Sequence, residues 1–443
     1  MDEHLPILII FFIIVSIAAA ALFYSTPLYA IFIVSGLFVF VASFVSIDLG
    51  LTIIIIAMMF SPEINVAEVP KRSVVIRIED IFLIVVFFSW IVRMAIDKEL
   101  GLLETTPINV PIFCFIGASL ISSVRGALLG RVTFIKSIFF SLKYTEYFLL
   151  FFMICNHIRT RKQIKYYLGV FVFVFILTAI YGFSQIGSGR ISTPFEGKSS
   201  EPATYGGYII IVGMVILSCA WHVKGIFLQL FLGGCFLFSI PPFLHSLSRA
   251  SYMGIIPAFF AFFFWTKKNK FFLVIAVMLA MVISVAFMPD FVKNRVKETF
   301  TGKEKPIAGQ ALKLEESATE RIDSWNRILL NKWPKQPLLG HGPGSLFVDG
   351  QYVTFLAENG FVGLLFFVWI FMTLFKVCFD NLKLLKGDDL AQGITIGFAS
   401  GMVGLLVHAL TANTFILIRV MEPLWFLAGI VVSLPKVAQE NVG

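Results

Sequence analysis

Charged residues are scarce in this chain of 443 residues, where they make up 14% of the sequence. A soluble domain of this length has about a quarter of its residues charged. Apolar residues account for 58% and include 50 phenylalanines, and runs such as IIIIAMMF and FVFVFILTAI have no counterpart in a soluble core. The composition excludes a soluble globular protein. It predicts an all-α, polytopic transmembrane helix bundle, because backbone groups in lipid must be bonded within helices.

Cysteine and histidine are too dispersed to build a disulfide framework or a metal site. The five cysteines all fall inside or at the ends of apolar segments, and no pair has metal-ligand spacing. No HExxH motif or His/Cys cluster occurs, so we expect no protein-bound metal. A P-loop, a dinucleotide-binding GxGxxG and a GxSxG elbow are absent too. The sequence therefore argues against nucleotide hydrolysis by this chain and predicts no cofactor.

Apolar blocks of roughly 20 residues, the length that crosses a bilayer, recur along the chain. Hydropathy gives about fourteen candidate spans, or about twelve if the three shortest are not full crossings. The first block lacks a basic leader and a cleavage site, so we expect it to be a retained helix. The spans are Pro6–Phe23, Leu28–Val45, Leu49–Phe60, Ile81–Met94, Val110–Ser123, Ile138–Cys155, Tyr166–Ile186, Tyr205–Trp221, Ile226–Ile240, Ser251–Trp265, Phe271–Phe287, Val353–Val377, Ile394–Leu410 and Phe415–Leu434.

One long polar segment, residues 289–352, interrupts these blocks. We therefore divide the chain into an N-terminal bundle (residues 1–288), a loop subdomain (289–352) and C-terminal transmembrane helices (353–443). Within the loop, Ala318–Lys332 has an apolar face and a polar one. This pattern predicts an amphipathic helix that lies against the membrane surface or over a cavity.

Lysine and arginine gather in three short segments, His157–Lys165, Lys267–Lys270 and Lys376–Lys386. Counting helices puts all three on one side of the membrane, which the positive-inside rule makes cytoplasmic. The same count puts residues 187–204, the Pro241–Ala250 loop and the long polar segment on the external side.

Several arginines fall on the external side, where the same rule disfavours them. Solvation or contact with lipid headgroups would explain them, and so would an anion site, because guanidinium groups bind phosphate in a bidentate manner. Arg249 in SLSRASYMG is the best single candidate, since Ser248 and nearby serines add donors. The long loop is only slightly positive, which favours a focused phosphate clamp and argues against a nucleic-acid partner. The external arginines are Arg125, Arg131, Arg190, Arg249, Arg321, Arg327 and Arg419.

Four segments follow one another in a recognisable order: Phe195–Ile211, Leu247–Gly254 (LSRASYMG), Glu320–Trp325 (ERIDSW) and Pro337–Gly360 (PLLGHGPG to AENG). Together they resemble the O-antigen ligase/polymerase family of bacterial membrane proteins, which includes lipopolysaccharide O-antigen ligases and Wzy-type polysaccharide polymerases. The resemblance covers about residues 187–410, and the N-terminal helices match only in general character.

The resemblance implies a glycosyltransferase of the bacterial inner (cytoplasmic) membrane, with its active site facing the periplasm or exterior. The implied donor is an oligosaccharide on undecaprenyl diphosphate. The acceptor is a sugar hydroxyl, on another lipid-linked glycan for a polymerase or on lipid A-core for a ligase. Transfer would need no metal and would invert the anomeric carbon. Membrane lipids and a chain-length regulator are further implied partners.

The resemblance also implies roles for individual residues. Many ligases carry His-Asn where this chain has Asp349-Gly350, so the base here is Asp349, Glu358 or His341, unless the donor itself assists. An aspartate at this position favours the polymerase branch. Glu358 also suits a role at a helix N-terminus. Diphosphate binding is expected of Arg249, Arg321, Arg190 and Arg327, and acceptor contact of Tyr352, Trp325 and Ser248, although the two aromatic residues also suit interface anchors.

Two other classes of protein compete with this interpretation. A lipid-linked glycan flippase or secondary transporter should have paired broken helices with charges near the membrane midplane. The sequence shows few charges within the predicted spans and a large external segment instead. A scaffold protein would not explain the external arginines. We therefore place glycosyl transfer first and transport second.

Overall fold

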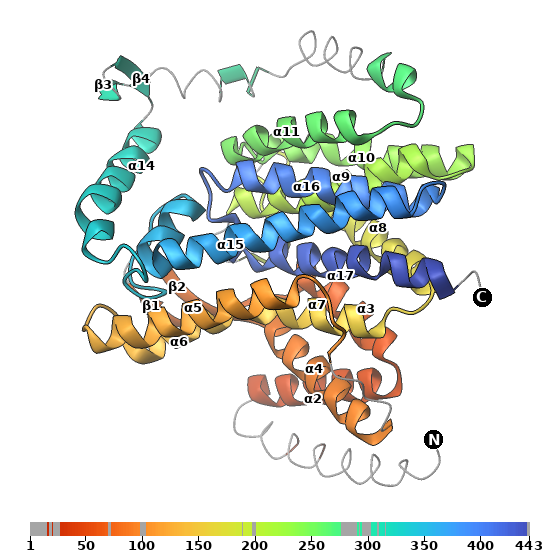
Figure 1. Cartoon of the computed structure of the whole chain (residues 1–443), viewed down its shortest axis with the longest axis horizontal. Helices are drawn as coiled ribbons and strands as arrows, with labels where there is room; N and C mark the ends of the chain where they lie inside the picture. The colour runs from red at the N-terminus through yellow and green to blue at the C-terminus, as the bar shows by residue number, and fades with distance from the viewer. Residues whose placement is uncertain are drawn as a thin grey trace.

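The protein is a bundle of long helices that lie side by side, with helix α14 and two β-hairpins at one end (Figure 1). Each hairpin is a two-stranded antiparallel sheet. The predicted all-α polytopic bundle is confirmed, and the hairpins are additions to it. The computed structural model describes residues 27–440 together with residues 16 and 20, except for 70–71, 98–102, 188, 197–200, 276–289, 292, 295–302, 308–309 and 315.

Two predicted spans of the N-terminal half are too short. Helices α4 and α5 each have 20 residues, because charged residues at their ends lower the hydropathy of turns that are nevertheless helical. The predicted span Ile138–Cys155 is interrupted at Tyr144–Thr145, between α6 and α7. The elements are α2 (Pro27–Val45), α3 (Ile47–Phe60), β1 (Glu63–Val69), β2 (Arg72–Arg77), α4 (Ile78–Asp97), α5 (Asn109–Leu128), α6 (Phe134–Lys143), α7 (Glu146–His157) and α8 (Arg161–Ser184).

The predicted Pro241–Ala250 loop is mostly helical. Helix α10 continues through both prolines to His245, which leaves only a short turn before α11. The remaining elements are α9 (Pro202–His222), α10 (Ile226–His245), α11 (Arg249–Trp265), β3 (Lys303–Ile307), β4 (Gln310–Leu314), α14 (Glu316–Asn326), η1 (Arg327–Lys332), η2 (Trp333–Lys335), α15 (Gln351–Leu384), α16 (Asp389–His408), η3 (Thr414–Ile416) and α17 (Ile418–Glu440).

Eight helical segments of the described chain are long and apolar enough to cross a bilayer, and three shorter apolar helices accompany them. Most of the predicted spans Pro6–Phe23 and Phe271–Phe287 lies outside the described residues. The expected total of twelve to fourteen crossings therefore stays a prediction.

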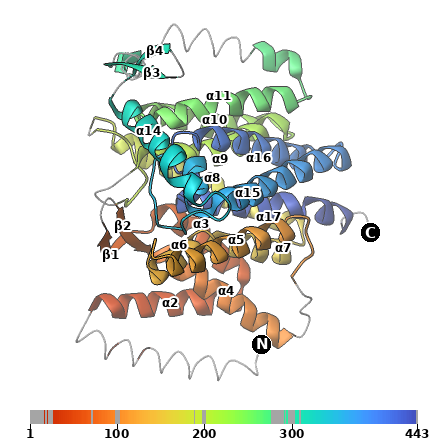
Figure 2. The same cartoon turned by 60° about the vertical axis from the view of Figure 1, so that its left-hand side comes forward.

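The predicted basic segments meet at one end of the bundle. Arg161 Nη2 lies 2.5 Å from Asp388 Oδ1, and Lys268 pairs with the next aspartate at 3.2 Å. At the opposite end, the Gln351 N–H donates to the Ala409 carbonyl (3.0 Å). We call these the basic end and the α14 end, and both are visible in Figure 2, where α14 lies opposite the C-terminus.

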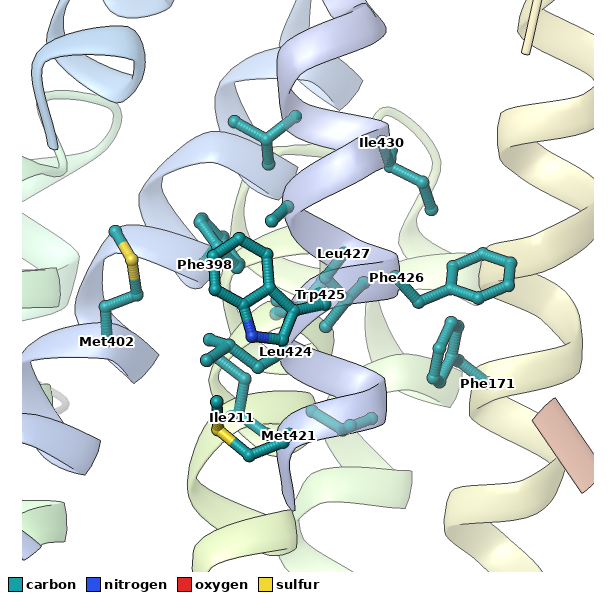
Figure 3. Packing of buried hydrophobic residues seen from close by; sticks show 14 of the residues in the cluster. Phe171, Ile211, Phe398, Met402, Met421, Leu424, Trp425, Phe426, Leu427 and Ile430 are labelled. Atoms are coloured by element: carbon teal, nitrogen blue, oxygen red, sulfur yellow. The ribbon is translucent and has the colours of Figure 1, made fainter. Parts of the chain in front are cut away.

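Helix α17 lies in the centre of the hydrophobic core. Trp425 is 1% exposed, and its ring centroid lies 4.5 Å from that of Phe148 in a T-shaped arrangement. Figure 3 shows Phe398 and Met402 on one side of α17 and Phe171 on the other. Aromatic pairs of this kind contribute about 1 kcal/mol each beyond their buried area. The tightly packed core therefore forms a rigid support for the elements at the α14 end.

Helix α16 packs closely on α9 through glycines spaced four residues apart. A Cβ on Gly397 would run into the α9 backbone at Val215, and a Cβ on Gly401 would collide with the Ile211 side chain. Small residues at this spacing let two helix backbones approach within a membrane. This contact fixes the position of His408 at the end of α16.

Helix α15 is kinked at Gly360, whose φ of 67° and ψ of −167° are not helical. The kink frees backbone groups, and the preceding loop satisfies them. The Phe361 N–H donates to the Pro337 carbonyl (2.8 Å), and the Gly342 N–H donates to the Glu358 carbonyl (2.9 Å). The glycine-rich PLLGHGPG segment thus supports the kink, because the two ends of the Pro337–Gly360 segment pair through their backbones.

Replacing Gly360 by alanine should destabilise the fold strongly. Its backbone conformation is nearly restricted to glycine, and an added Cβ would collide with the Leu338 carbonyl. We expect a loss of about 3 kcal/mol or more, measured as a fall in Tm of the detergent-solubilised protein. Gly169→Ala in α8 is the matched control, because nothing lies within 4 Å of its added methyl group. Equal melting temperatures for both variants would contradict the role assigned to the kink.

Candidate functional site

Two predicted site residues lie in contact at the α14 end. Arg321 Nε lies 3.3 Å from Asp349 Oδ2, and the Trp325 indole N–H donates to the Asp349 carbonyl. Arg321 and Trp325 are four residues apart and share one face of α14. Gly350 follows with a φ of 114°, where a Cβ would crowd the Trp325 ring. The sequence Asp-Gly is therefore suited to this close approach between α14 and the start of α15.

The Arg321–Asp349 pair is open to solvent. The arginine side chain is 26% exposed and the aspartate side chain 53%. Exposed ion pairs contribute only about 0–1 kcal/mol to stability. The pair therefore contributes little to the stability of the fold. An anionic ligand could displace the carboxylate from the guanidinium at little cost in free energy.

The predicted amphipathic segment is helical, but its last six residues form a π-helix, η1. Ile328 is buried with Val348 and Ala357, and Trp325 packs against this small cluster. Arg327, at the first position of η1, is exposed. π-helical turns are rare and occur frequently at functional sites. The apolar contacts fix this segment on the start of α15 and leave its arginines on the outside.

The turn between α10 and α11 brings two more predicted residues close. Arg190 Nη2 donates to the Leu247 carbonyl (3.3 Å), and Arg249 begins α11 two residues later, half-buried. Ser248 is buried and caps α11 by accepting a hydrogen bond from the Ser251 N–H (3.4 Å). Arg190 and Arg249 therefore both lie near the head of α11, and their role in an anion site stays a prediction.

A buried chain of hydrogen bonds holds the head of α11. The Ser251 hydroxyl donates to Ser248 Oγ (2.8 Å) and lies 3.3 Å from His408 Nε2. The other ring nitrogen of His408 lies 2.6 Å from Thr414 Oγ1. The network joins α11, α16 and η3, so it fixes the position of the helix that carries Arg249.

The two other candidate bases, Glu358 and His341, are buried next to the kink at Gly360. The Glu358 carboxylate accepts hydrogen bonds from the Tyr144 hydroxyl (2.6 Å) and the Gly344 N–H (2.8 Å). His341 is 3% exposed, and its Nε2–H donates to the Lys332 carbonyl (3.0 Å). Both side chains hold the loop in place, whereas Asp349 is exposed.

Tyr352 contacts the bundle. Its hydroxyl donates to the Leu406 carbonyl of α16 (2.7 Å), and its ring packs near Phe367. This arrangement suits an anchor for the start of α15.

A buried charged cluster at the same end was missed by the sequence reasoning. Lys143 Nζ lies 2.6 Å from Asp80 Oδ2 and 3.1 Å from Glu146 Oε1, and Arg77 pairs with Glu63 at 2.5 Å. Lys143 and Glu146 lie within the predicted span Ile138–Cys155, whereas Asp80, Arg77 and Glu63 lie outside the predicted spans. The charges inside apolar runs such as FFSLKYTEYFLL could have predicted such a cluster. Ionisable groups in membrane helices are costly and usually functional.

Arg419 and Glu422, on α17, belong to the same region and are both 0% exposed. The Arg419 guanidinium donates to the Ser61 carbonyl (2.8 Å) and to the Pro194 carbonyl. It thereby ties the loop after α8 to the end of α3. Among the described residues, the carboxylate oxygens of Glu79 and Glu422 have no hydrogen-bond partner.

Comparison with known families bears directly on this end of the molecule. Residues 234–368 match the model of a family described as O-antigen ligase. We call residues 234–368 the O-antigen ligase domain, after the family to which they are similar. The resemblance to the O-antigen ligase/polymerase family is thereby confirmed, and it supports a multi-pass membrane glycosyltransferase that acts on a lipid-linked glycan donor and an acceptor. No curated protein matches the chain.

The O-antigen ligase domain contains most of the candidate residues. It includes the head of α11, α14 and the kinked start of α15, and so the Arg321–Asp349 pair. Arg190 and the buried charged cluster lie outside it. Contacts such as Arg190 with the Leu247 carbonyl nevertheless join the two parts.

Acid should destabilise the protein through His341. Burial lowers its pKa below the usual 6.5, and the charges of Arg131, Lys332 and Arg125 lower it further. The folded state therefore keeps the ring neutral, while the unfolded chain binds a proton below about pH 6.5. Stability is lost as pH falls from 6.5 through the folded pKa. His341→Gln should reduce the fall in Tm between about pH 6.5 and 5, and a Tm difference from the wild type that stays constant over this range would contradict the assignment.

Proposed function

We propose that this protein transfers a glycan from an undecaprenyl-diphosphate donor to a sugar hydroxyl at the α14 end of the bundle, on the external face of the bacterial inner membrane. The favoured reaction is Wzy-type polymerisation of surface polysaccharide repeat units. The observation that carries the proposal is the solvent-open contact between Arg321 and Asp349 within the O-antigen ligase domain. It pairs a cation suited to a diphosphate with a carboxylate suited to proton transfer.

The arginines of this end would hold the donor diphosphate. Arg249 and Arg190 lie at the head of α11, and Arg321 and Arg327 lie on α14 and η1. Charge-assisted bonds from guanidinium to phosphate are stronger than neutral hydrogen bonds. When the diphosphate departs, its growing negative charge is stabilised by these cations. No metal or nucleotide is needed for that stabilisation.

Asp349 would act as the base. The acceptor hydroxyl oxygen forms a bond to the anomeric carbon while the bond from that carbon to the diphosphate oxygen breaks. The hydroxyl proton passes to the Asp349 carboxylate, and undecaprenyl diphosphate leaves with the bonding electron pair. Displacement from the opposite face inverts the anomeric carbon. Arg321 would exchange its bond to Asp349 for one to the donor, which leaves the carboxylate able to accept the proton.

Trp325 is the best placed of the three candidates for contact with the acceptor sugar, since it is half-buried directly beside Asp349. Ser248 and Tyr352 are engaged in holding α11 and α15. Asp349 stands where many ligases carry histidine, and this difference supports the polymerase over the ligase.

Reconstitution tests the proposal. The purified full-length protein is placed in liposomes with its lipid-linked oligosaccharide, a chelator, no nucleotide and no second acceptor. A ladder of lengthening glycans on a gel is expected. A ladder that disappears with chelator would contradict a metal-independent reaction.

The same preparation separates the alternatives. Transfer that begins only after lipid A-core is supplied would identify an O-antigen ligase. Absence of transfer under both conditions, together with movement of the lipid-linked glycan across the bilayer, would identify a flippase. The charges inside the helices make that control necessary, because transporters share this feature.

A further inference from the structure

Three cations gather around His341 on the side of the α14 end formed by α5, α6 and the η1–η2 segment. Arg125, Arg131 and Lys332 all act electrostatically on this histidine. Arg125 also donates to the Gln336 side chain. Lys136 and Lys335 continue the positive charge along the two segments. We call these five residues the α6 patch.

Among the residues that the structure describes, the α6 patch forms no ion pair. Residues 105–145 and 324–348 contain no aspartate or glutamate. None of the ion pairs formed between described residues involves a member of the patch, whereas some cations at the basic end are paired. Arg159 lies 3.5 Å from Glu104, and Lys436 lies 2.8 Å from the same carboxylate. The patch therefore presents uncompensated charge for a ligand outside the chain.

Large apolar side chains are exposed between these cations. Leu128 and Ile135 are each 83% exposed, and Leu330 is 71% exposed. A soluble anion would leave such surface in water, but a bilayer surface buries it while its phosphates meet the charges. The turn between α5 and α6 also joins two helical segments long enough to cross a bilayer, which places it at the membrane surface.

We propose that the α6 patch binds anionic phospholipid headgroups of the bilayer and fixes the α14 end against the membrane surface. The site is separate from the Arg321–Asp349 pair and does not depend on glycosyl transfer. Cationic side chains hold the headgroup phosphate, and the exposed leucines and isoleucine enter the boundary between headgroups and acyl chains.

Photo-crosslinking tests this proposal without any glycan substrate. The full-length protein is reconstituted with trace photoactivatable phosphatidylglycerol or phosphatidylcholine of identical chains, and labelled peptides are mapped. Phosphatidylglycerol should label peptides 124–136 and 327–338 more strongly than phosphatidylcholine. Each removed charge should weaken association roughly fivefold. The variant Arg131→Gln/Lys332→Gln/Lys335→Gln should then label about 100-fold less with phosphatidylglycerol.

The matched control is Lys376→Gln/Lys383→Gln/Lys386→Gln at the opposite end, which should leave the labelling of these two peptides unchanged. Equal labelling by both lipids in the wild type would overturn the proposal. Competition by millimolar inorganic phosphate would overturn it too, because it would identify a site for a soluble anion. The wild-type comparison decides the matter even if the triple variant fails to fold.

Discussion

Replacing Asp349 by asparagine is expected to lower turnover about 100- to 10,000-fold, the range for loss of a general base. The amide keeps the size of the side chain but cannot accept the acceptor proton. Asp349 is exposed beside Arg321, so no buried contact is lost and Tm should stay unchanged. Donor binding should be nearly preserved, because the arginines remain. The measurement is turnover and donor affinity of reconstituted protein.

Asp323→Asn is the matched control for this variant. It removes an exposed carboxylate from α14, two residues from Arg321. Its turnover should remain near that of the wild type. Normal turnover in Asp349→Asn would exclude Asp349 as the base and leave assistance by the donor or another group. A matching loss in both variants would instead indicate that the net charge near Arg321 matters.

Much of the fold was predictable because lipid imposes simple constraints on a sequence. Helices in lipid must be apolar and long, so hydropathy predicted them. The placement of lysine and arginine predicted which loops lie together at the basic end. The π-helix η1 after α14 was not predictable, since its apolar spacing also fits an α-helix. The helix through Pro241 and Pro242 was missed because proline normally ends a helix.

The candidate site was predictable where residues are close in sequence or share a helix face. Arg321 and Trp325 lie four residues apart, and the structure brings both to Asp349. The roles of Glu358 and His341 depend on a kink at Gly360 that pairs segments about 20 residues apart. Sequence spacing alone could not show that Glu358 and His341 are buried and support the loop, whereas Asp349 is exposed.

The buried charged cluster shows a different limit of the sequence reasoning. Lys143, Asp80 and Glu146 come from separate helices, and only tertiary packing makes them partners. In the sequence, Asp80 stands at the start of one apolar run, and Lys143 and Glu146 lie within another. Burying such charges singly would be prohibitive, so their pairing is required by the fold. The cluster supports the end of the bundle next to the O-antigen ligase domain.

Replacing Arg249 by alanine should lower glycan transfer about 100- to 1,000-fold, as for removal of one preorganised group that stabilises a departing anion. Ser248 and the hydrogen-bonded chain through Ser251 and His408 hold the head of α11, so helix and fold should persist. Arg249→Lys should recover part of the activity, because a point charge remains without the bidentate geometry. Transfer rates in liposomes at matched protein levels measure both effects.

Arg159→Ala at the basic end is the matched control, since it removes an exposed, ion-paired arginine far from the head of α11. It should transfer glycan at the wild-type rate. If Arg249→Ala also transfers at that rate, the diphosphate does not contact the head of α11. If lysine restores nothing while Tm stays unchanged, the guanidinium fork itself is required, which identifies bidentate phosphate contact as the source of the rate enhancement.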